Sequence, residues 1–117
     1  MDESRPIFQQ IAEQIENDII SGALPEETQV PSTNEFAAFH RINPATAGKG
    51  VNLLVDDGIL YKKRGIGMFV AEGARARLVA KRRDQFSQQY IAPLLAEASK
   101  LGISSGEVAA MIQKGSK

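Results

Sequence analysis

The 117-residue chain contains no cysteine and only one histidine, His40. The lack of cysteine excludes disulfide bonds and thiolate metal sites, and a lone histidine argues against a histidine-based metal centre or catalytic base. No apolar run approaches the roughly 20 residues of a membrane-spanning helix, and the acidic N-terminal stretch lacks the apolar centre of a signal peptide. A cytoplasmic location fits these absences.

Groups of residues that could form a catalytic or cofactor-binding site are also missing. The sequence has no nucleophile–base pair, no ligand cluster and no phosphate-binding loop, so we expect neither an enzyme nor a cofactor. The hydrophobic share of 43% is ordinary for a folded, soluble protein. The chain is therefore expected to act by binding a partner.

Basic side chains are nearly absent from the first forty residues, which carry eight acids and one base, Arg5. Residues 41–83 reverse this balance with ten bases and three acids, although the whole chain has a formal net charge of zero. A basic middle segment suits a polyanion such as nucleic acid. The alternative is that the acidic segment folds over the basic segment and cancels its charge.

Two helices are predicted in the acidic segment. Isoleucine recurs every four residues from Ile7 to Ile19, which gives one apolar stripe on a helix that ends at Gly22. After a turn-rich connector, Ser32 and Glu35 have the spacing of a capping box at the start of a short second helix. The apolar face of that helix consists of Phe36, Ala37 and Phe39.

A third helix is predicted from about Pro44 to Asp57, with Asn43 as its N-cap. Two glycines interrupt it, and each costs a helix interior roughly 1 kcal/mol relative to alanine. Gly50 fits close packing against another helix, whereas Gly48 is expected to face outward, where a small residue lets a partner approach closely. The buried stripe of this helix consists of Ala47, Val51, Leu54 and Val55.

A β-hairpin with its tip at residues 64–67 is predicted next, because alternating residues flank a glycine-punctuated turn there. Three helices followed by a hairpin is the order of a winged helix-turn-helix domain. The predicted fold class is therefore mainly α with a small β-hairpin. A winged helix-turn-helix domain would occupy residues 1–73, and a two-helix dimerisation segment would occupy residues 74–117.

The tail carries apolar residues along a helical stripe that Pro93 is expected to kink or split. Gly102 ends one helix, Ser104 or Ser105 caps the next, and residues 108, 109 and 112 are expected to face inward. Two helices of about 45 residues cannot bury this surface alone, so we expect a second copy to cover it. The alternative is that the tail packs back on its own first domain. The predicted dimer interface consists of Leu78, Val79, Arg82, Phe86, Tyr90, Ile91, Leu94, Leu95, Leu101, Val108 and Ile112.

A helix-turn-helix presents the start of its second helix, here the third helix of the chain, to the DNA major groove. The basic hairpin tip is suited to phosphates or to the minor groove, and the start of the preceding helix offers free amides to phosphate. The alternative for the hairpin charges is a solvated face. Gly65 and Gly67 are expected to permit positive φ rather than to bind a nucleotide. The predicted DNA contacts are Ser32, Thr33, Asn34, Arg41, Asn43, Ala45, Thr46, Lys49, Lys62, Lys63, Arg64, Gly65 and Gly67.

Three stretches resemble the GntR family of bacterial transcription regulators: PIFQQIAEQIENDIISGALP, VPSTNEFAAFHRINPATAGKGVNLLVDDGIL and KKRGIGMFVAEG. Together they cover nearly all of residues 6–73. The INPAT turn and the short tail are similar to the YtrA-like subgroup, which has a two-helix dimerisation segment in place of a large effector domain. The resemblance implies a homodimeric regulator, usually a repressor, on a pseudo-palindromic double-stranded DNA operator.

The chain departs from the family pattern at Asn34, Pro44, Gly48, Ile66 and Met68, so base specificity cannot be copied from relatives. A competing interpretation is a winged-helix dimer that contacts protein or RNA without specific DNA recognition. The acidic first segment favours it and the basic hairpin argues against it. The short tail leaves little room for a metabolite cavity, so an effector, if one exists, is expected to change the angle between two DNA-binding heads.

Overall fold

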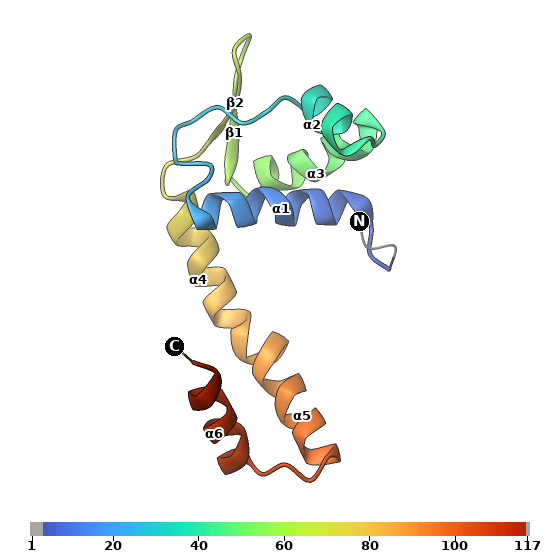
Figure 1. The fold of residues 1–117 in the computed structure, drawn as a ribbon. Coiled ribbons are helices and arrows are strands. Elements are labelled where there is room, and N and C mark those ends of the chain that lie inside the picture. The colour runs from blue at the N-terminus through green and yellow to red at the C-terminus, as the bar shows by residue number, and fades with distance from the viewer. Residues whose placement is uncertain (1–3, 117) are drawn as a thin grey trace. The chain divides into compact units, whose positions relative to one another are not determined.

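The computed structural model describes residues 4–116 of the chain (Figure 1). These residues form two compact units that divide between Val79 and Ala80. Elements of the first unit are α1 (Ile7–Ser21), α2 (Thr33–His40), α3 (Pro44–Asp56), β1 (Leu60–Lys63), β2 (Gly67–Val70) and the start of α4 (Ala74–Phe86). The second unit contains the rest of α4, the π-helix η1 (Ser87–Ile91), α5 (Ala92–Lys100) and α6 (Ser105–Gly115). The predicted winged helix-turn-helix order is confirmed. Over the described residues no helix combines the length and hydrophobicity required to span a membrane.

The helix starts follow the local sequence. The capping box of α2 is complete, because the Glu35 N–H donates to Ser32 Oγ at 3.1 Å and the Ser32 N–H donates to Glu35 Oε1 at 3.1 Å. At α3 the Ala45 N–H donates to Asn43 Oδ1 at 2.7 Å, and Pro44 follows the cap directly. Both helices therefore begin where the capping residues predict.

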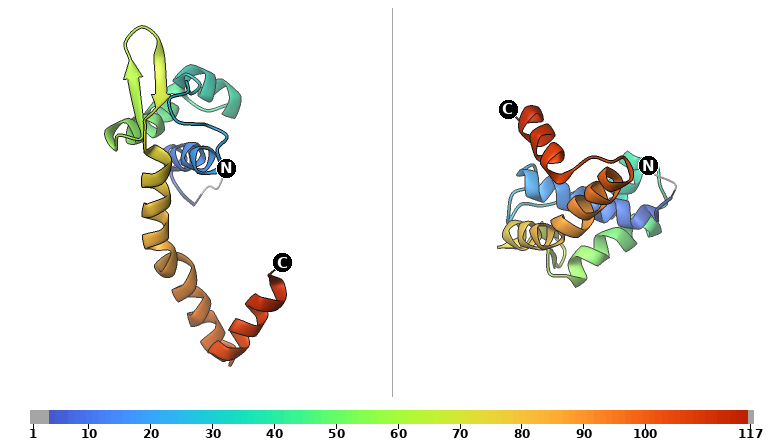
Figure 2. Two further views of the ribbon diagram at one scale, coloured as in Figure 1. Left: turned by 90° about the vertical axis from the view of Figure 1, so that its left-hand side faces the viewer. Right: turned by 90° about the horizontal axis from the view of Figure 1, so that it is seen from below.

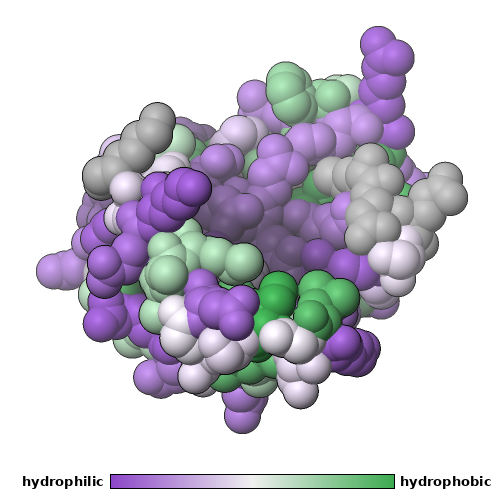
Figure 3. Space-filling view, turned by 60° about the horizontal axis from the view of Figure 1, so that its bottom comes forward, coloured by the Kyte–Doolittle hydropathy of each residue, from purple (hydrophilic) through white to green (hydrophobic). Residues whose placement is uncertain are grey.

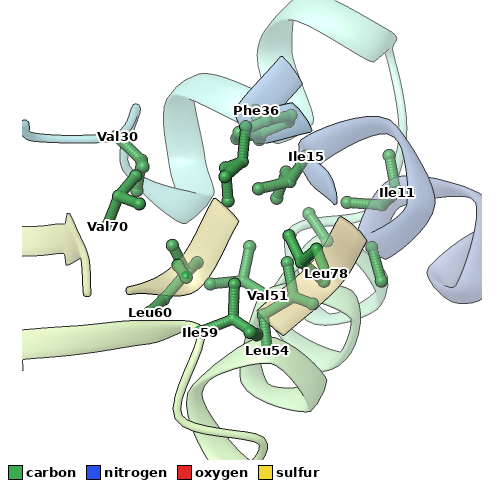
Figure 4. Close-up of a cluster of buried hydrophobic side chains, with 14 of the residues drawn as sticks. Ile11, Ile15, Val30, Phe36, Val51, Leu54, Ile59, Leu60, Val70 and Leu78 are labelled. Carbon is green, nitrogen blue, oxygen red and sulfur yellow. The ribbon is translucent and has the colours of Figure 1, made fainter. Parts of the chain in front are cut away.

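The core of the first unit lies between α1, α3 and the base of the hairpin (Figure 4). It includes the predicted isoleucine stripe of α1 from Ile11 to Ile19 and the stripe of α3, whose Val55 is only half-buried. Ala74 and Leu78 of α4 are also buried in this core. The compact unit therefore continues past the predicted boundary at residue 73. Leu78, a residue of the predicted dimer interface, is instead a core residue of its own chain, because the first turns of α4 close the hydrophobic cluster.

The hairpin is antiparallel, with Leu60 opposite Val70 and Lys63 opposite Gly67, and it projects from the helices of its unit (Figure 2). The connector before α2 runs beside β2. The Val30 N–H donates to the Met68 carbonyl at 2.9 Å, and the Val70 N–H donates to the Thr28 carbonyl at 3.0 Å. The wing is thus supported along one edge by a third extended segment.

Two expectations for the helix-turn-helix are corrected. Gly50 packs closely on α1 as predicted, but Gly48 is half-buried, and a Cβ there would lie 3.4 Å from the Thr33 methyl of α2. Phe39 is 81% exposed rather than part of an apolar face, because α2 directs Phe36 into the core and Phe39 away from it. With Phe36, Pro31 of the connector and other residues of α1 and α2, Phe39 lines a surface hollow of about 430 Å³.

In the second unit the helical path is interrupted before Pro93, as predicted. The Ala92 N–H donates to the Ser87 carbonyl five residues earlier, which forms the π turn η1. A proline clashes with the carbonyl of an α-helical turn, and the wider turn relieves that clash. Ser104 caps α6 by accepting from the Glu107 N–H at 3.1 Å.

Little of this second unit is buried within the chain. Ala98 and Val108 are its buried apolar residues among those described. Val108 therefore packs inside its own chain and not on the predicted interface, whereas Ala109 and Ile112, expected to face inward, are exposed. Figure 3 shows hydrophobic and hydrophilic side chains next to one another on one face of the molecule. In the second unit, large apolar side chains reach solvent. They are Phe86, Tyr90, Leu94, Leu95, Leu101, Met111 and Ile112.

Candidate nucleic-acid interface

The N-terminal half of α3 displays most of its predicted contact residues. Ala45 and Lys49 are exposed and Thr46 is half-buried, since the opposite side of the helix carries the core residues. The Asn43 oxygen is used in capping, which leaves the amide nitrogen as its free donor. This surface offers a methyl group, a hydroxyl and a cation, which can contact base edges and phosphates.

Lys49 is positioned by a residue that no sequence pattern singles out. Its ammonium lies 4.1 Å from the centroid of the Phe8 ring on α1, a cation–π distance. The contact restricts the long side chain to the α1 side of α3 while the lysine stays exposed. Phe8 and Lys49 are 41 positions apart, so only packing of α1 on α3 reveals the pair.

The start of α2 is less open to phosphate than predicted. The Ser32 oxygen already accepts a hydrogen bond in the capping box, and the Glu35 carboxylate lies beside it. Hydrogen bonds from the Ser32 N–H and then from its hydroxyl lower the pKa of Glu35 below its ordinary value, so this carboxylate stays charged. Thr33 is half-buried against Gly48, whereas Asn34 is exposed and able to reach a partner.

Arg41 marks the turn between α2 and α3. It takes a left-handed conformation with φ 56°, and its N–H caps α2 by donating to the Ala37 and Ala38 carbonyls. The residue is exposed. Arg41 thus lies in the turn directly before the helix that a helix-turn-helix presents to DNA.

The hairpin tip gathers three basic residues, Lys62, Lys63 and Arg64, which we call the basic wing residues; all are exposed. The Lys63 ammonium lies 4.4 Å from the Phe69 ring centroid, which holds it along one face of the hairpin. Because side chains alternate along a strand, Lys62 shares a face with Leu60, which is opposite to the face of Lys63. The wing therefore presents positive charge on both of its faces.

The glycines of the tip have the conformations that the sequence predicts. Gly65 has φ 76° and Gly67 has φ 149°, and both values favour glycine. The Ile66 N–H donates to the Lys63 carbonyl at 3.0 Å, which closes the turn. The side chain of Gln29 reaches the same tip and donates from Nε2 to the Ile66 carbonyl at 3.2 Å. Sequence reasoning missed Gln29, because nothing local marks a residue 37 positions before its partner.

The connector between α1 and α2 carries two acids that contact the hairpin base and α4. Its Glu27 accepts a hydrogen bond from the Tyr61 hydroxyl at the hairpin base, which raises the pKa of Tyr61, and its Glu26 accepts from the Arg75 N–H. Salt bridges among the described residues join Arg5 to Glu13 and Glu97 to Lys100, and neither pair includes a basic wing residue. Glu26 and Glu27 therefore have partners other than the basic wing residues.

Arg77 ties α4 to the end of α3. Its guanidinium donates to the Asp57 carbonyl at 2.7 Å and to the Gly58 carbonyl at 3.2 Å, which satisfies carbonyl groups at a helix C-terminus.

Among the residues described, no group of three His, Cys, Asp or Glu side chains is placed to hold a metal ion. The site thus consists of exposed donors and cations on a rigid scaffold, which suits binding of a polyanion.

Comparison with known proteins agrees with this geometry. Residues 7–70 match the model of "Bacterial regulatory proteins, gntR family". The chain is similar to the HTH-type transcriptional repressor YtrA of Bacillus subtilis, with 29% identity over 86% of this chain and 76% of YtrA. A GntR family transcriptional regulator from Listeria monocytogenes has a similar structure, with TM-score 0.78 and 27% identity over 99% of this chain and 100% of that one.

A DNA-bound structure is also similar to part of this chain. The DNA-binding domain of AraR in complex with operator ORX1 matches with TM-score 0.55 and 30% identity over 61% of this chain and 87% of that one. The family match covers more than half of the chain, and it lies on the helices and the wing described above. The chain therefore belongs to the gntR family of bacterial regulatory proteins, which are transcription regulators and not enzymes.

Proposed function

We propose that this regulator binds a pseudo-palindromic DNA operator as a homodimer and represses transcription by occupying it. The observation that carries the proposal is the pairing of an exposed α3 N-terminus with a basic wing on one unit. In a winged helix-turn-helix such a helix enters the major groove and the wing contacts the neighbouring backbone. The similarity to the operator complex of AraR supports the same mode of binding here.

The contact set that we propose is revised in the light of the fold. The residues assigned to contact bases are Asn43, Ala45, Thr46 and Lys49. The residues assigned to contact phosphates are Arg41 and the basic wing residues. At the start of α2, Asn34 is the exposed donor, whereas Ser32 and Thr33 mainly hold the helix-turn-helix together. Gly65 and Gly67 shape the tip rather than contact bases.

The homodimer is proposed from the apolar surface of the second unit. Phe86 is 54% and Tyr90 62% exposed, their ring centroids lie 5.4 Å apart, and further large apolar side chains of this unit reach solvent. Such a surface on a small unit needs a cover, and a two-fold partner covers it with the same surface. Leu78 and Val108 are left out of the proposed interface, because each is buried within its own chain.

The repressor role and the cytoplasmic location are proposed from the relatives and the family rather than from the geometry of the site. The relative YtrA is named a transcriptional repressor, and a regulator of this family acts where the chromosome is.

The proposal is tested by selecting bound duplexes from a random DNA pool with the purified protein and sequencing them. A two-fold symmetric motif is the expected result, and log affinity should fall steeply with log salt, because neutralised phosphates release counterions. No enriched motif together with a flat salt dependence would contradict operator binding. The alternative of a winged-helix dimer for protein or RNA contact would then be favoured.

A further inference from the structure

The tip of the wing presents an apolar side chain to solvent. Ile66 is 64% exposed and stands between Gly65 and Gly67, two positions after the last basic wing residue. Met68, two residues later, packs against the core of the unit, whereas Ile66 is outside that core. Packing of the described residues thus gives no reason for an isoleucine at the apex of a cationic hairpin.

The backbone around Ile66 is held in one shape. Its N–H donates to the Lys63 carbonyl at 3.0 Å, and its carbonyl accepts from Gln29 Nε2 at 3.2 Å. The Gln29 side chain also fills the space that a Cβ on Gly67 would need. Ile66 therefore projects from a preorganised turn, which lowers the conformational entropy lost when the tip binds a partner.

We infer that Ile66 is a specificity-determining residue that enters the DNA minor groove and favours A·T over G·C pairs beneath the wing. This inference rests on the proposed operator binding. The minor groove is about 6 Å wide, and a tip with a single side chain between two glycines is narrow enough to enter it. The basic wing residues draw the tip to the groove, where A·T tracts concentrate negative potential.

The preference follows from the chemistry of the groove floor. An A·T pair presents only acceptors there, whereas guanine adds its 2-amino group, which protrudes and donates hydrogen bonds. The methyl groups of Ile66 have no acceptor for that amino group and would separate it from water. A G·C pair under the wing therefore bears the cost of a buried donor without a partner, and an A·T pair does not.

Base analogues test this directly with the full chain and a selected operator. Replacing A·T by G·C under the wing should weaken binding by about tenfold. An inosine·C pair, which lacks only the 2-amino group, should restore binding, and a 2,6-diaminopurine·T pair, which adds it, should weaken binding as G·C does. Inosine·C binding as weakly as G·C would overturn the inference. Uracil in place of thymine should have no effect, and a loss there would overturn the inference by placing the contact in the major groove.

Variants connect the preference to the side chain. Ile66→Ala should reduce the A·T preference from about tenfold to below about threefold, while Ile66→Val should keep it. Gln29→Ala, which frees the tip, should reduce it partly. Phe39→Ala is the matched control, because it removes another exposed apolar side chain of the same unit. An Ile66→Ala variant that keeps the A·T preference and still binds DNA in a salt-dependent way would overturn this inference but not the proposed operator binding. Failure of the wild-type chain to bind any duplex would instead overturn the proposed function.

Discussion

The two glycines of α3 lie in different environments, and alanine substitutions should separate them. A Cβ on Gly50 would lie 2.5 Å from the Phe8 carbonyl oxygen and 3.0 Å from Ile11 Cβ, both on α1. A Cβ on Gly48 would lie 3.4 Å from the Thr33 methyl, which is an ordinary contact. Gly50→Ala should therefore destabilise the protein, and Gly48→Ala should not.

The expected magnitude follows from two opposing effects. Alanine gains about 1 kcal/mol over glycine in a helix interior, and both variants receive this gain. Overpacking a core costs about 1–3 kcal/mol, with the upper end where backbone must move. At Gly50 the obstacle is a backbone carbonyl, so α1 and α3 must separate. We expect a net loss of about 2 kcal/mol for Gly50→Ala, which is a fall in Tm of roughly 10 °C, and a gain of up to about 1 kcal/mol for Gly48→Ala.

Urea and thermal unfolding followed by far-UV circular dichroism measure both variants against the wild type. The urea midpoint should fall for Gly50→Ala at an unchanged m value, because the surface exposed on unfolding is the same. A Gly50→Ala protein as stable as the wild type would refute the close approach of α1 and α3. Equal destabilisation by both substitutions would show that the loss comes from α3 itself and not from the contact with α1.

Four further predictions concern the wing, the dimer and the two residues of the capping box of α2. Alanine at all three basic wing residues should weaken binding to every duplex, and the slope of log affinity against log salt should become less negative by about 0.9 for each phosphate that the protein no longer neutralises; an unchanged slope would remove the wing from the backbone contacts. Replacing Phe86 and Tyr90 by glutamine should produce monomers in sedimentation experiments, and an unchanged dimer would place the interface elsewhere. Ser32→Ala should lower the free energy of unfolding by about 1 kcal/mol in chemical denaturation. Because the folded-state pKa of Glu35 is lowered, its contribution to stability is present above its ordinary pKa of 4.5 and is lost as pH falls through the folded value. Glu35→Gln should flatten the acid limb of the melting temperature against pH, and an unaltered limb would contradict the capping role.

Much of the first unit follows from local sequence rules. The isoleucine spacing of α1, the capping box at Ser32 and the cap at Asn43 each predict a helix start or a buried face that the structure contains. Pro93 predicts the interrupted helix of the second unit, because the clash of a proline ring with a preceding carbonyl depends only on the backbone. The predicted basic wing residues are likewise exposed at the hairpin tip.

Contacts between distant segments could not be predicted in this way. The positions of Gln29 against the wing tip and of Phe8 under Lys49 depend on how helices and connector pack, and no local pattern encodes them. The burial of Leu78 could not be predicted either. Leu78 and Phe86 belong to one apolar stripe of the sequence, but Leu78 is buried in its own chain and Phe86 is exposed.

The sequence alone determined where helices start, where the chain must turn and which segment carries positive charge, since caps, prolines, glycines and charges act over a few residues. The tertiary structure decided which apolar residues the chain buries itself and which remain exposed for a partner. It also decided that Gly48 faces Thr33 rather than solvent. The physical reason is that burial and preorganisation are properties of surfaces brought together by packing, and residues far apart in the chain supply the two sides.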